Sequence, residues 1–452
     1  MDKPRTVAFT VLQAVSKDDA YANLTLPNQL GAAGLTGRDA ALATELSYGC
    51  LRASGTLDEV LRRCSTRPLP DIEIAVLNLL RLGAYQLLRT RIPTHAAVAT
   101  TVDLARSTGN TRAAGFVNAV LRKVAARDFD TWCAEITEGA SALGQLAVRH
   151  SHPGWIVGAF ADVLGDDPAE IEAALSADDA RPETHLVAWP GRIERDELVA
   201  QSGGTPGPYS PYAVRLTEGG EPAALPAIKG RQAGVQDEGS QLCALALAAL
   251  PLSGPDERWL DLCAGPGGKA ALLAALATDR GAHLTAQELH PHRAELITRA
   301  TEGWDVDVRV GDARKLQPDE RGYDRVLLDA PCTGLGALRR RPEARWRRTP
   351  DDLADLVPLQ DELLAAALRL VRPGGVVAYV TCSPHLAETS AHITRALQAD
   401  DTIELLDARP AFNTVCGLPD SATVQLWPHR HGTDAMFFAA LRRGTSASSW
   451  AH

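Results

Sequence analysis

The sequence predicts an all-α bundle over residues 1–127, a small linking α/β subdomain over 128–230 and a doubly wound α/β sheet over 231–443, with a tail over 444–452. Three observations predict this order. Apolar residues recur at helical spacing in the first region. Proline, glycine and acidic residues dominate the second, and strand and helix patterns alternate in the third. A chain of 452 residues is also too long for one ordinary domain.

Apolar spacing and chain breakers divide the first region into six or seven helices of 10–18 residues, which indicates a compact bundle. The clearest apolar stripe runs over residues 72–82. Breaks are expected at Gly31 and Gly34, at Ser54-Gly55, over 68–70, at Pro93 and at 108–109. Thr36 is expected to cap a helix that begins beside it.

Bulk properties narrow the class of protein. The net charge of −10 argues weakly against a nucleic-acid partner, but residues 1–127 carry +6 and residues 128–230 carry −11. Local basic patches must therefore hold any RNA. No apolar run of about 18 residues and no leader-like start is present, so we expect a cytoplasmic protein without a membrane span. The eight cysteines lack C-x-x-C spacing, so no metal site is expected. The sequence carries no signal for the oligomeric state, and no oligomer is predicted from it.

A glycine-rich turn follows the first strand of the third region. The candidate strands there are 258–262, 283–288, 307–310, 325–329, 375–381 and 436–441. Glycines allow close approach of a ligand, and the following helix offers free N–H groups. Glu288 ends the next strand, where a carboxylate can accept hydrogen bonds from ribose hydroxyls, and Asp312 ends the third, where it can accept the adenine amine. Because dinucleotide and P-loop spacings are absent, these strand ends favour another adenosine-containing cofactor.

Two cysteines follow two further strands. Cys332 comes after the fourth strand and Cys382 after the fifth, each in a proline-bearing turn above the same predicted crevice. A thiolate that adds to carbon 6 of cytosine makes carbon 5 nucleophilic toward an electrophilic methyl group. Asp329 is placed to stabilise the charge that develops beside ring nitrogen 3, and a second thiol can assist release.

Four motifs over residues 231–443 resemble the NOL/NOP/Sun family of RNA 5-methylcytosine methyltransferases. They are VQDEGSQ (235–241), DLCAGPGGK (261–269), DAPCTGLG (329–336) and TCSP (381–384). The resemblance implies a Rossmann-like methyltransferase sheet with S-adenosyl-L-methionine as cofactor. It also implies that Cys382 is the nucleophile, that Cys332 assists release, and that Asp329 and Lys269 complete the catalytic set. The implied cofactor contacts are Cys263, Ala264, Gly265, Pro266, Gly267, Gly268, Lys269, Glu288, Arg293, Asp312 and Asp329.

Two departures from the family pattern stand out. Gly265 occupies a position where the family usually has alanine. The run D-A-M-F-F over 434–438 replaces the family's frequent D-G-F-F. We expect the backbone near the substrate to differ slightly as a result.

Motifs in the first region resemble the NusB-like domain that is fused to the RsmB/Sun enzymes. They lie at 81–88, 92–98 and 115–122, and H-P-G-W at 152–155 resembles the linker of those enzymes. This order of domains implies 16S ribosomal RNA as the substrate. Two alternatives stay open: the same chemistry on transfer RNA, and a non-catalytic RNA-binding or assembly factor. A nicotinamide-dependent dehydrogenase is disfavoured by the glycine spacing and the paired thiols.

A basic segment that follows Cys332 is the predicted RNA contact. Arginines pair with phosphates, and guanidinium or indole planes stack on unpaired bases. We also expect residues 429–431 to reach the substrate strand, although a structural role is favoured for His431 over that of a general base. The target base must be turned out of any helix to reach the crevice. The predicted RNA-binding residues are Arg339, Arg340, Arg341, Arg345, Trp346, Arg347, Arg348 and His431.

Overall fold

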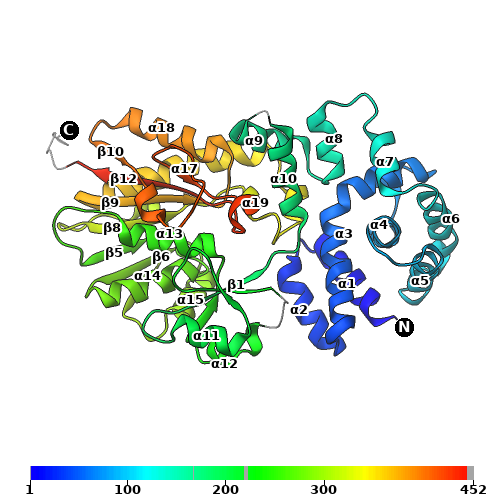
Figure 1. Ribbon diagram of the computed structural model, residues 1–452, viewed down its shortest axis with the longest axis horizontal. Coiled ribbons are helices and arrows are strands. Elements are labelled where there is room, and N and C mark those ends of the chain that lie inside the picture. Colours follow the sequence, from blue (N-terminus) through cyan, green and yellow to red (C-terminus); the bar gives the residue numbers. More distant parts are fainter. Residues whose placement is uncertain (1, 166, 218–221, 445–452) are drawn as a thin grey trace. The chain divides into compact units, whose positions relative to one another are not determined.

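The computed structural model describes residues 2–165, 167–217 and 222–444, and these divide into two units. The helical unit comprises residues 2–180 together with 338–348, and the sheet unit comprises 181–337 and 349–444. The predicted all-α bundle and doubly wound sheet are confirmed (Figure 1). The expected linking subdomain is divided between the units, because residues 128–180 pack with the helices and residues 181–230 with the sheet.

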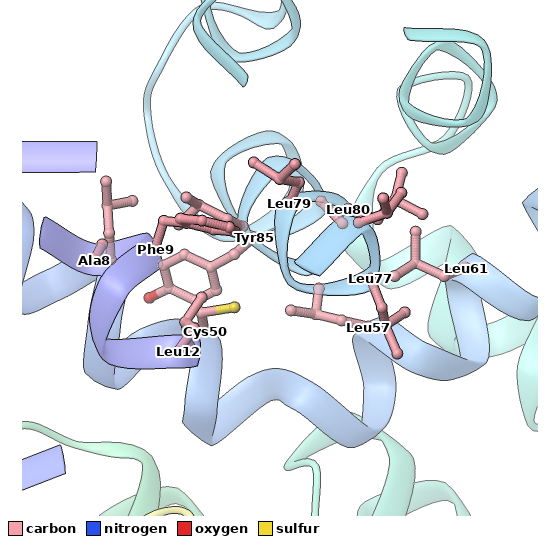
Figure 2. Packing of buried hydrophobic residues seen from close by; sticks show 14 of the residues in the cluster. Ala8, Phe9, Leu12, Cys50, Leu57, Leu61, Leu77, Leu79, Leu80 and Tyr85 are labelled. Carbon is pink, nitrogen blue, oxygen red and sulfur yellow. The ribbon is translucent and has the colours of Figure 1, made fainter. Parts of the chain in front are cut away.

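Leucine-rich faces of three long helices form the core of the helical unit. Figure 2 shows residues of α1, α3 and α4 packed against one another, among them Leu12, Leu57 and Leu80. All three side chains are almost fully buried. The helices of this unit are α1 (Lys3–Lys17), α2 (Ala22–Ala33), α3 (Gly37–Cys64), α4 (Ile74–Arg89), α5 (Thr94–Ser107), α6 (Ala114–Val124), α7 (Phe129–Ile136), α8 (Ala142–Arg149), α9 (Gly154–Leu164), α10 (Pro168–Asp179) and α16 (Ala344–Arg347).

The predicted break at Ser54-Gly55 is wrong, because α3 runs unbroken from Gly37 to Cys64 and exceeds the expected length of 18 residues. Gly55 instead permits a close approach: a Cβ built there would lie 2.0 Å from Cη2 of Trp346. Thr36 does occupy the N-cap position of α3, as expected, but its side chain makes no capping hydrogen bond.

Residues 338–348 belong to the helical unit although they lie between two strands of the large sheet in sequence. Arg345 is fully buried there. Its Nη1 lies 2.9 Å from Oδ1 of Asp179, and its Nη2 donates to the carbonyl of Asp178 at 3.2 Å. Arg347 donates to the carbonyls of Val15 and Ala20. The segment is therefore an integral part of the helical unit.

A large sheet organises the second unit. Its strand order is β10-β12-β9-β8-β5-β6-β7, with β11 paired to β12. Strands β5 to β9 are parallel, whereas β10, β11 and β9 pair antiparallel with β12. The strands are β5 (Arg258–Asp261), β6 (His283–Glu288), β7 (Val306–Val310), β8 (Tyr323–Asp329), β9 (Val371–Thr381), β10 (Ile403–Leu406), β11 (Val424–Gln425) and β12 (Phe437–Arg443).

Helices cover both faces of this sheet. Figure 1 shows α13, α14 and α15 on one side and α17 and α18 on the other. Alternate residues of β9 enter the two cores: Ala378 packs on the α13–α14 side and Tyr379 on the α17 side. This alternation is what a doubly covered parallel sheet requires. The helices are α13 (Glu238–Ala249), α14 (Gly268–Asp279), α15 (Pro291–Ala300), α17 (Asp351–Leu370), α18 (Ser390–Ala399) and α19 (Pro428–His431).

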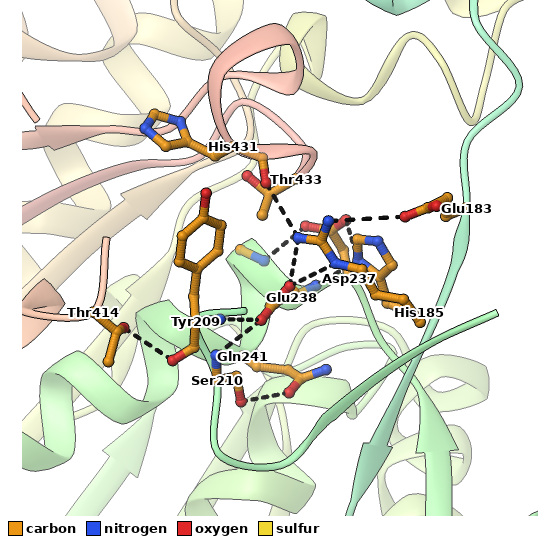
Figure 3. Close-up of polar contacts among 12 residues, drawn as sticks. Glu183, His185, Tyr209, Ser210, Asp237, Glu238, Gln241, Thr414, His431 and Thr433 are labelled. Carbon is orange, nitrogen blue, oxygen red and sulfur yellow. Dashed lines mark hydrogen bonds and ion pairs between the residues drawn. The ribbon is translucent and has the colours of Figure 1, made fainter. Parts of the chain in front are cut away.

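A small four-stranded sheet, in the order β2-β3-β1-β4, precedes the large one. Figure 3 shows the buried Glu238 of the VQDEGSQ motif at its junction with α13. Glu238 accepts hydrogen bonds from the backbone of Tyr209 and Ser210 and from the Arg215 guanidinium, so the motif has a structural role here. The elements are β1 (Thr184–Ala188), β2 (Thr205–Pro206), β3 (Ala213–Leu216), β4 (Ala233–Val235), α11 (Arg195–Ser202) and α12 (Pro226–Lys229).

Within the described ranges, no helix is both long and apolar enough to span a bilayer.

Candidate active site

The site lies at the carboxyl ends of three neighbouring strands of the large sheet. Strand β5 is flanked by β6 and by β8, so the direction of strand order changes there, and ligands of open α/β sheets bind at such a point. Asp329 ends β8, and Cys382 directly follows β9. Adjacent parallel strands thus bring together residues that are more than 50 positions apart in sequence.

The two predicted cysteines face each other. Sγ of Cys332 lies 3.5 Å from Sγ of Cys382, and both residues are half-buried. The backbone of the turn is fixed as well, since the N–H of Gly336 donates to the carbonyl of Cys382 at 2.9 Å. A mechanism that uses both thiols on one base requires this juxtaposition of sulfur atoms.

Lys269 and Asp329 form an ion pair beside the thiols, with Nζ 2.8 Å from Oδ2. Burial is the largest single influence and opposes the charged form of Lys269, but the charge and hydrogen bond of Asp329, together with Cys243 and Cys382, raise the lysine pKa. The hydrogen bond from the Cys332 thiol lowers the pKa of Cys382; burial and Asp329 oppose this shift, and the Lys269 ammonium supports it. The same hydrogen bond, together with burial, raises the pKa of Cys332. The pair is therefore asymmetric, with the thiolate favoured at Cys382.

The glycine-rich turn and Glu288 are in contact in this structure. The Gly265 N–H donates to Oε2 of Glu288 at 3.2 Å, and Nη2 of Arg293 donates to the Gly265 carbonyl at 2.6 Å. A Cβ on Gly265 would lie 2.2 Å from that carboxylate oxygen, so the glycine lets Glu288 approach the turn. Gly267 has a φ of 112°, which only glycine adopts readily, at the start of α14.

Asp312 follows β7 as expected, but its carboxylate forms an ion pair with Arg314. The guanidinium of Arg314 donates from Nε at 2.9 Å and from Nη2 at 2.8 Å, and these bonds lower the pKa of Asp312. An adenine amine would have to share this carboxylate with the arginine.

Asp261, at the end of β5, is a site residue that the sequence analysis missed. It is 1% exposed, and among the described residues no group meets normal hydrogen-bond geometry to either carboxyl oxygen, although the Cys263 backbone N–H is close enough to lower its pKa. Burial and the nearby Asp329 raise its pKa to about 8. Its place in the D-L-C-A-G-P-G-G-K motif was the signal available in the sequence. An unpartnered carboxyl beside a glycine-rich turn suits a polar ligand that carries an amino group.

The structure separates the predicted RNA-binding residues into exposed and buried ones. Arg341 and Trp346 are exposed, and Arg340 and Arg348 are half-buried. Arg345 is fully buried, Arg339 is 6% exposed and Arg347 is half-buried with its guanidinium on backbone carbonyls, so RNA contact by these three finds no support. His431 is also buried, and its Nδ1 accepts from the Trp427 backbone N–H, which favours the structural role.

Comparison with known proteins identifies the class. A model described as 16S rRNA methyltransferase RsmB/F matches residues 249–442, and a model of the NusB family matches residues 2–126. A protein of Mycobacterium tuberculosis (strain ATCC 25618 / H37Rv) that is named as a methyltransferase is 54% identical over 98% of this chain and 97% of its own. The ribosomal RNA small subunit methyltransferase B of Salmonella arizonae is 33% identical over 96% of this chain and 97% of its own.

Solved structures share the fold. The crystal structure of PH0851 covers 97% of this chain and 99% of its own, with a TM-score of 0.80 at 22% identity. That of NSun6 from Pyrococcus horikoshii covers 65% of this chain and 99% of its own, with a TM-score of 0.55 at 19% identity. Fold and relatives together define a methyltransferase with a fused helical domain.

The chain belongs to the RsmB/F family of methyltransferases and carries a NusB-family domain at its N-terminal side. Methylation in this family depends on S-adenosylmethionine. The residues present fit that cofactor: the free N–H groups at the start of α14, the carboxylate of Glu288 and the unpartnered Asp261 carboxyl offer the donors and acceptors that its carboxylate, ribose and amino groups require.

Proposed function

We propose that the protein methylates carbon 5 of a cytosine in 16S ribosomal RNA through a covalent bond between Cys382 and the base. The observation that carries this proposal is the pair of sulfur atoms 3.5 Å apart, next to the Lys269–Asp329 ion pair at the same strand ends. A structural cysteine needs neither a second thiol nor a buried cation nearby.

In the first step the Cys382 thiolate attacks carbon 6 of the cytosine ring. The carbon 5–carbon 6 double bond opens, and its electron pair becomes available at carbon 5. A proton from solvent binds ring nitrogen 3, where the Asp329 carboxylate stabilises it, and this proton makes carbon 6 more electrophilic. Lys269 holds that carboxylate in position through the 2.8 Å ion pair. S-adenosylmethionine supplies the electrophilic methyl group that carbon 5 receives.

Release requires a base for the proton on carbon 5. Once the sulfur of Cys382 is bonded to carbon 6, the adjacent thiolate is gone, and Cys332 loses its proton to solvent more readily. The Cys332 thiolate then takes the proton from carbon 5, the ring double bond reforms, Cys382 leaves as a thiolate, and the proton on ring nitrogen 3 returns to solvent. Both sulfur atoms return to the hydrogen-bonded state of the free enzyme.

The cofactor is proposed to bind the 263–269 turn, with Glu288 on its ribose and with Arg293, Asp312 and Asp329 at the rim. RNA contact is proposed for the partly or fully exposed members of the basic segment, which are Arg340, Arg341, Trp346 and Arg348. Guanidinium groups there would hold phosphates, and the indole would stack on an unpaired base.

Ribosomal RNA is favoured over transfer RNA because full-length relatives are named for the small-subunit RNA and the NusB-family domain is present. A non-catalytic assembly factor is disfavoured by the intact thiol pair and ion pair.

Variants of the two cysteines test the mechanism. Cys382→Ala should abolish methylation while calorimetry shows unchanged S-adenosylmethionine binding. Cys332→Ala should accumulate a protein–RNA adduct that survives denaturing electrophoresis, and the double variant should form none. Full activity of Cys382→Ala would refute the mechanism. Bisulfite sequencing of RNA from a deletion strain tests the substrate, since loss of a transfer-RNA mark with all 16S marks intact would reject ribosomal RNA.

A further inference from the structure

A buried hydrogen-bond network lies directly behind the two cysteines. Thr333 follows Cys332, Ser383 follows Cys382, and the two hydroxyl oxygens are 3.2 Å apart. Both side chains are buried, with at most 1% exposure. The network therefore links the two cysteine-bearing turns through their next residues.

Glu388, in the 3₁₀ turn Leu386–Glu388, closes this network and is itself fully buried. Its Oε1 accepts from the Thr333 backbone N–H at 2.8 Å, and its Oε2 accepts from the Thr333 hydroxyl at 2.5 Å. Since Thr333 donates its only hydroxyl proton to Glu388, Ser383 must donate to Thr333. The order of donors thus runs from Ser383 through Thr333 to the carboxylate.

Helix α17 and strand β9 hold Glu388 in place. Nε2 of Gln360 donates to Oε1 of Glu388 at 3.0 Å and to the Pro331 carbonyl at 2.8 Å. The hydroxyl of Tyr379 donates to the Glu388 carbonyl at 2.9 Å. The peptide on each side of Cys332 is consequently fixed, on one side through Pro331 and on the other through Thr333.

We propose that Glu388 is a positioning residue that holds Cys332 against Cys382 and keeps their shared proton on Cys332. This inference rests on the proposed function. Three donors to the side chain match an ionised carboxylate, and its negative charge disfavours a second anion at Cys332. On the other side of the pair, the Lys269 ammonium favours the anion at Cys382.

Other charged groups also interact with the two thiols, but they do not cancel the preference for the anion at Cys382. Asp329 disfavours the anion at both sulfur atoms, and Asp434 disfavours it at Cys382. The charged or titratable groups that interact with the two thiols are Lys269 from α14, Cys243 from α13, Asp329 from β8, Asp434 before β12, Tyr379 from β9 and Glu388.

Alkylation of the full-length protein by iodoacetamide at pH 7 tests the proposal, because the reagent reacts with thiolates. Peptide mass spectrometry gives the labelling rates of Cys382 and Cys332, and the exposed Cys416 serves as the internal reference. Glu388→Gln keeps the size of the side chain but removes its charge. If the gap between the two thiol pKa values narrows by about one unit, the labelling rate of Cys382 relative to that of Cys332 falls about tenfold. We expect that fall, together with a lower kcat and unchanged cofactor binding.

Thr333→Val provides a second variant, because it removes the hydroxyl link and leaves Glu388 in place. It should lower the same rate ratio, whereas Thr333→Ser, which keeps the hydroxyl, should retain the wild-type ratio. A wild-type ratio in both Glu388→Gln and Thr333→Val would overturn the proposal, even if their melting temperatures fall. The proposed function would fail in a different experiment, namely if Cys382→Ala methylated RNA at the full rate. The labelling ratio and this activity therefore test the two proposals separately.

Discussion

Replacing Arg345 with methionine measures how much the helical unit depends on residues 338–348. Methionine keeps much of the aliphatic stem but removes the charge that lies 2.9 Å from Asp179. The Asp179 side chain, 17% exposed, would lose its arginine partner. Breaking a buried ion pair from one side costs about 3–5 kcal/mol. Because Asp179 keeps some solvent contact and its interaction with His150 at 3.3 Å, we expect about 3 kcal/mol.

Amide hydrogen exchange of the full-length protein is the assay, since a chain of two units does not unfold in one step. Helices α3 and α10 should lose protection by about 100-fold, which corresponds to 1.4 kcal/mol per factor of ten. Strand β9 of the sheet unit serves as the reference. The double variant Arg345→Met/Asp179→Asn should be more stable than Arg345→Met alone, because it also removes the Asp179 charge that has lost its arginine partner. A change below about fivefold in α3 and α10, or equal losses in β9, would refute the reasoning.

Two further predictions concern packing and pH. Gly55→Ala should destabilise the protein by about 1–3 kcal/mol because its Cβ meets Trp346, whereas Gly158→Ala on α9, with no atom within 4 Å, should be neutral or stabilising. Equal melting temperatures for both variants would contradict this. Asp261 keeps its proton in the folded protein up to its pKa of about 8, whereas the unfolded chain releases it above about pH 4. The contribution of Asp261 to the free energy of unfolding should therefore fall as pH rises from about 4 to 8 and stay level above 8. Asp261→Asn should remove that slope in melting temperatures from pH 5 to 9, and an unchanged slope would reject the assignment.

Local sequence signals predicted the strands that carry the site. The expected strand at 283–288 has the same bounds as the observed β6. Its bounds were predictable because the apolar alternation and the polar residues that flank it are all local in the sequence. Strand β9 begins at Val371, four residues before the predicted start, and it includes Pro373 and Gly374, residue types that usually interrupt a strand. Strands β10 and β11 were not predicted. Both are short, and they are specified mainly by pairing with β12.

Long-range packing explains most of the other differences. Gly55 resembles a helix breaker until Trp346, distant in sequence, is placed against it. Glu388 and Thr333 are common residue types 55 positions apart, and no local pattern distinguishes them from surface residues. The paired cysteines were predictable because each follows a strand, and parallel strands bring their ends to one edge.

The membership of residues 338–348 in the helical unit has a practical consequence for dissecting the protein. The chain passes between the units three times, near residues 180, 337 and 348, so no single cut separates them. A fragment that ends at residue 180 would lack the Arg345 guanidinium, which is buried in the helical unit. A fragment that starts at residue 181 would carry the basic segment 338–348, which begins six residues after Cys332, without the helices that it packs against. Recombinant dissection should therefore graft the eleven-residue insert onto the helical fragment and bridge residues 337 and 349 in the other.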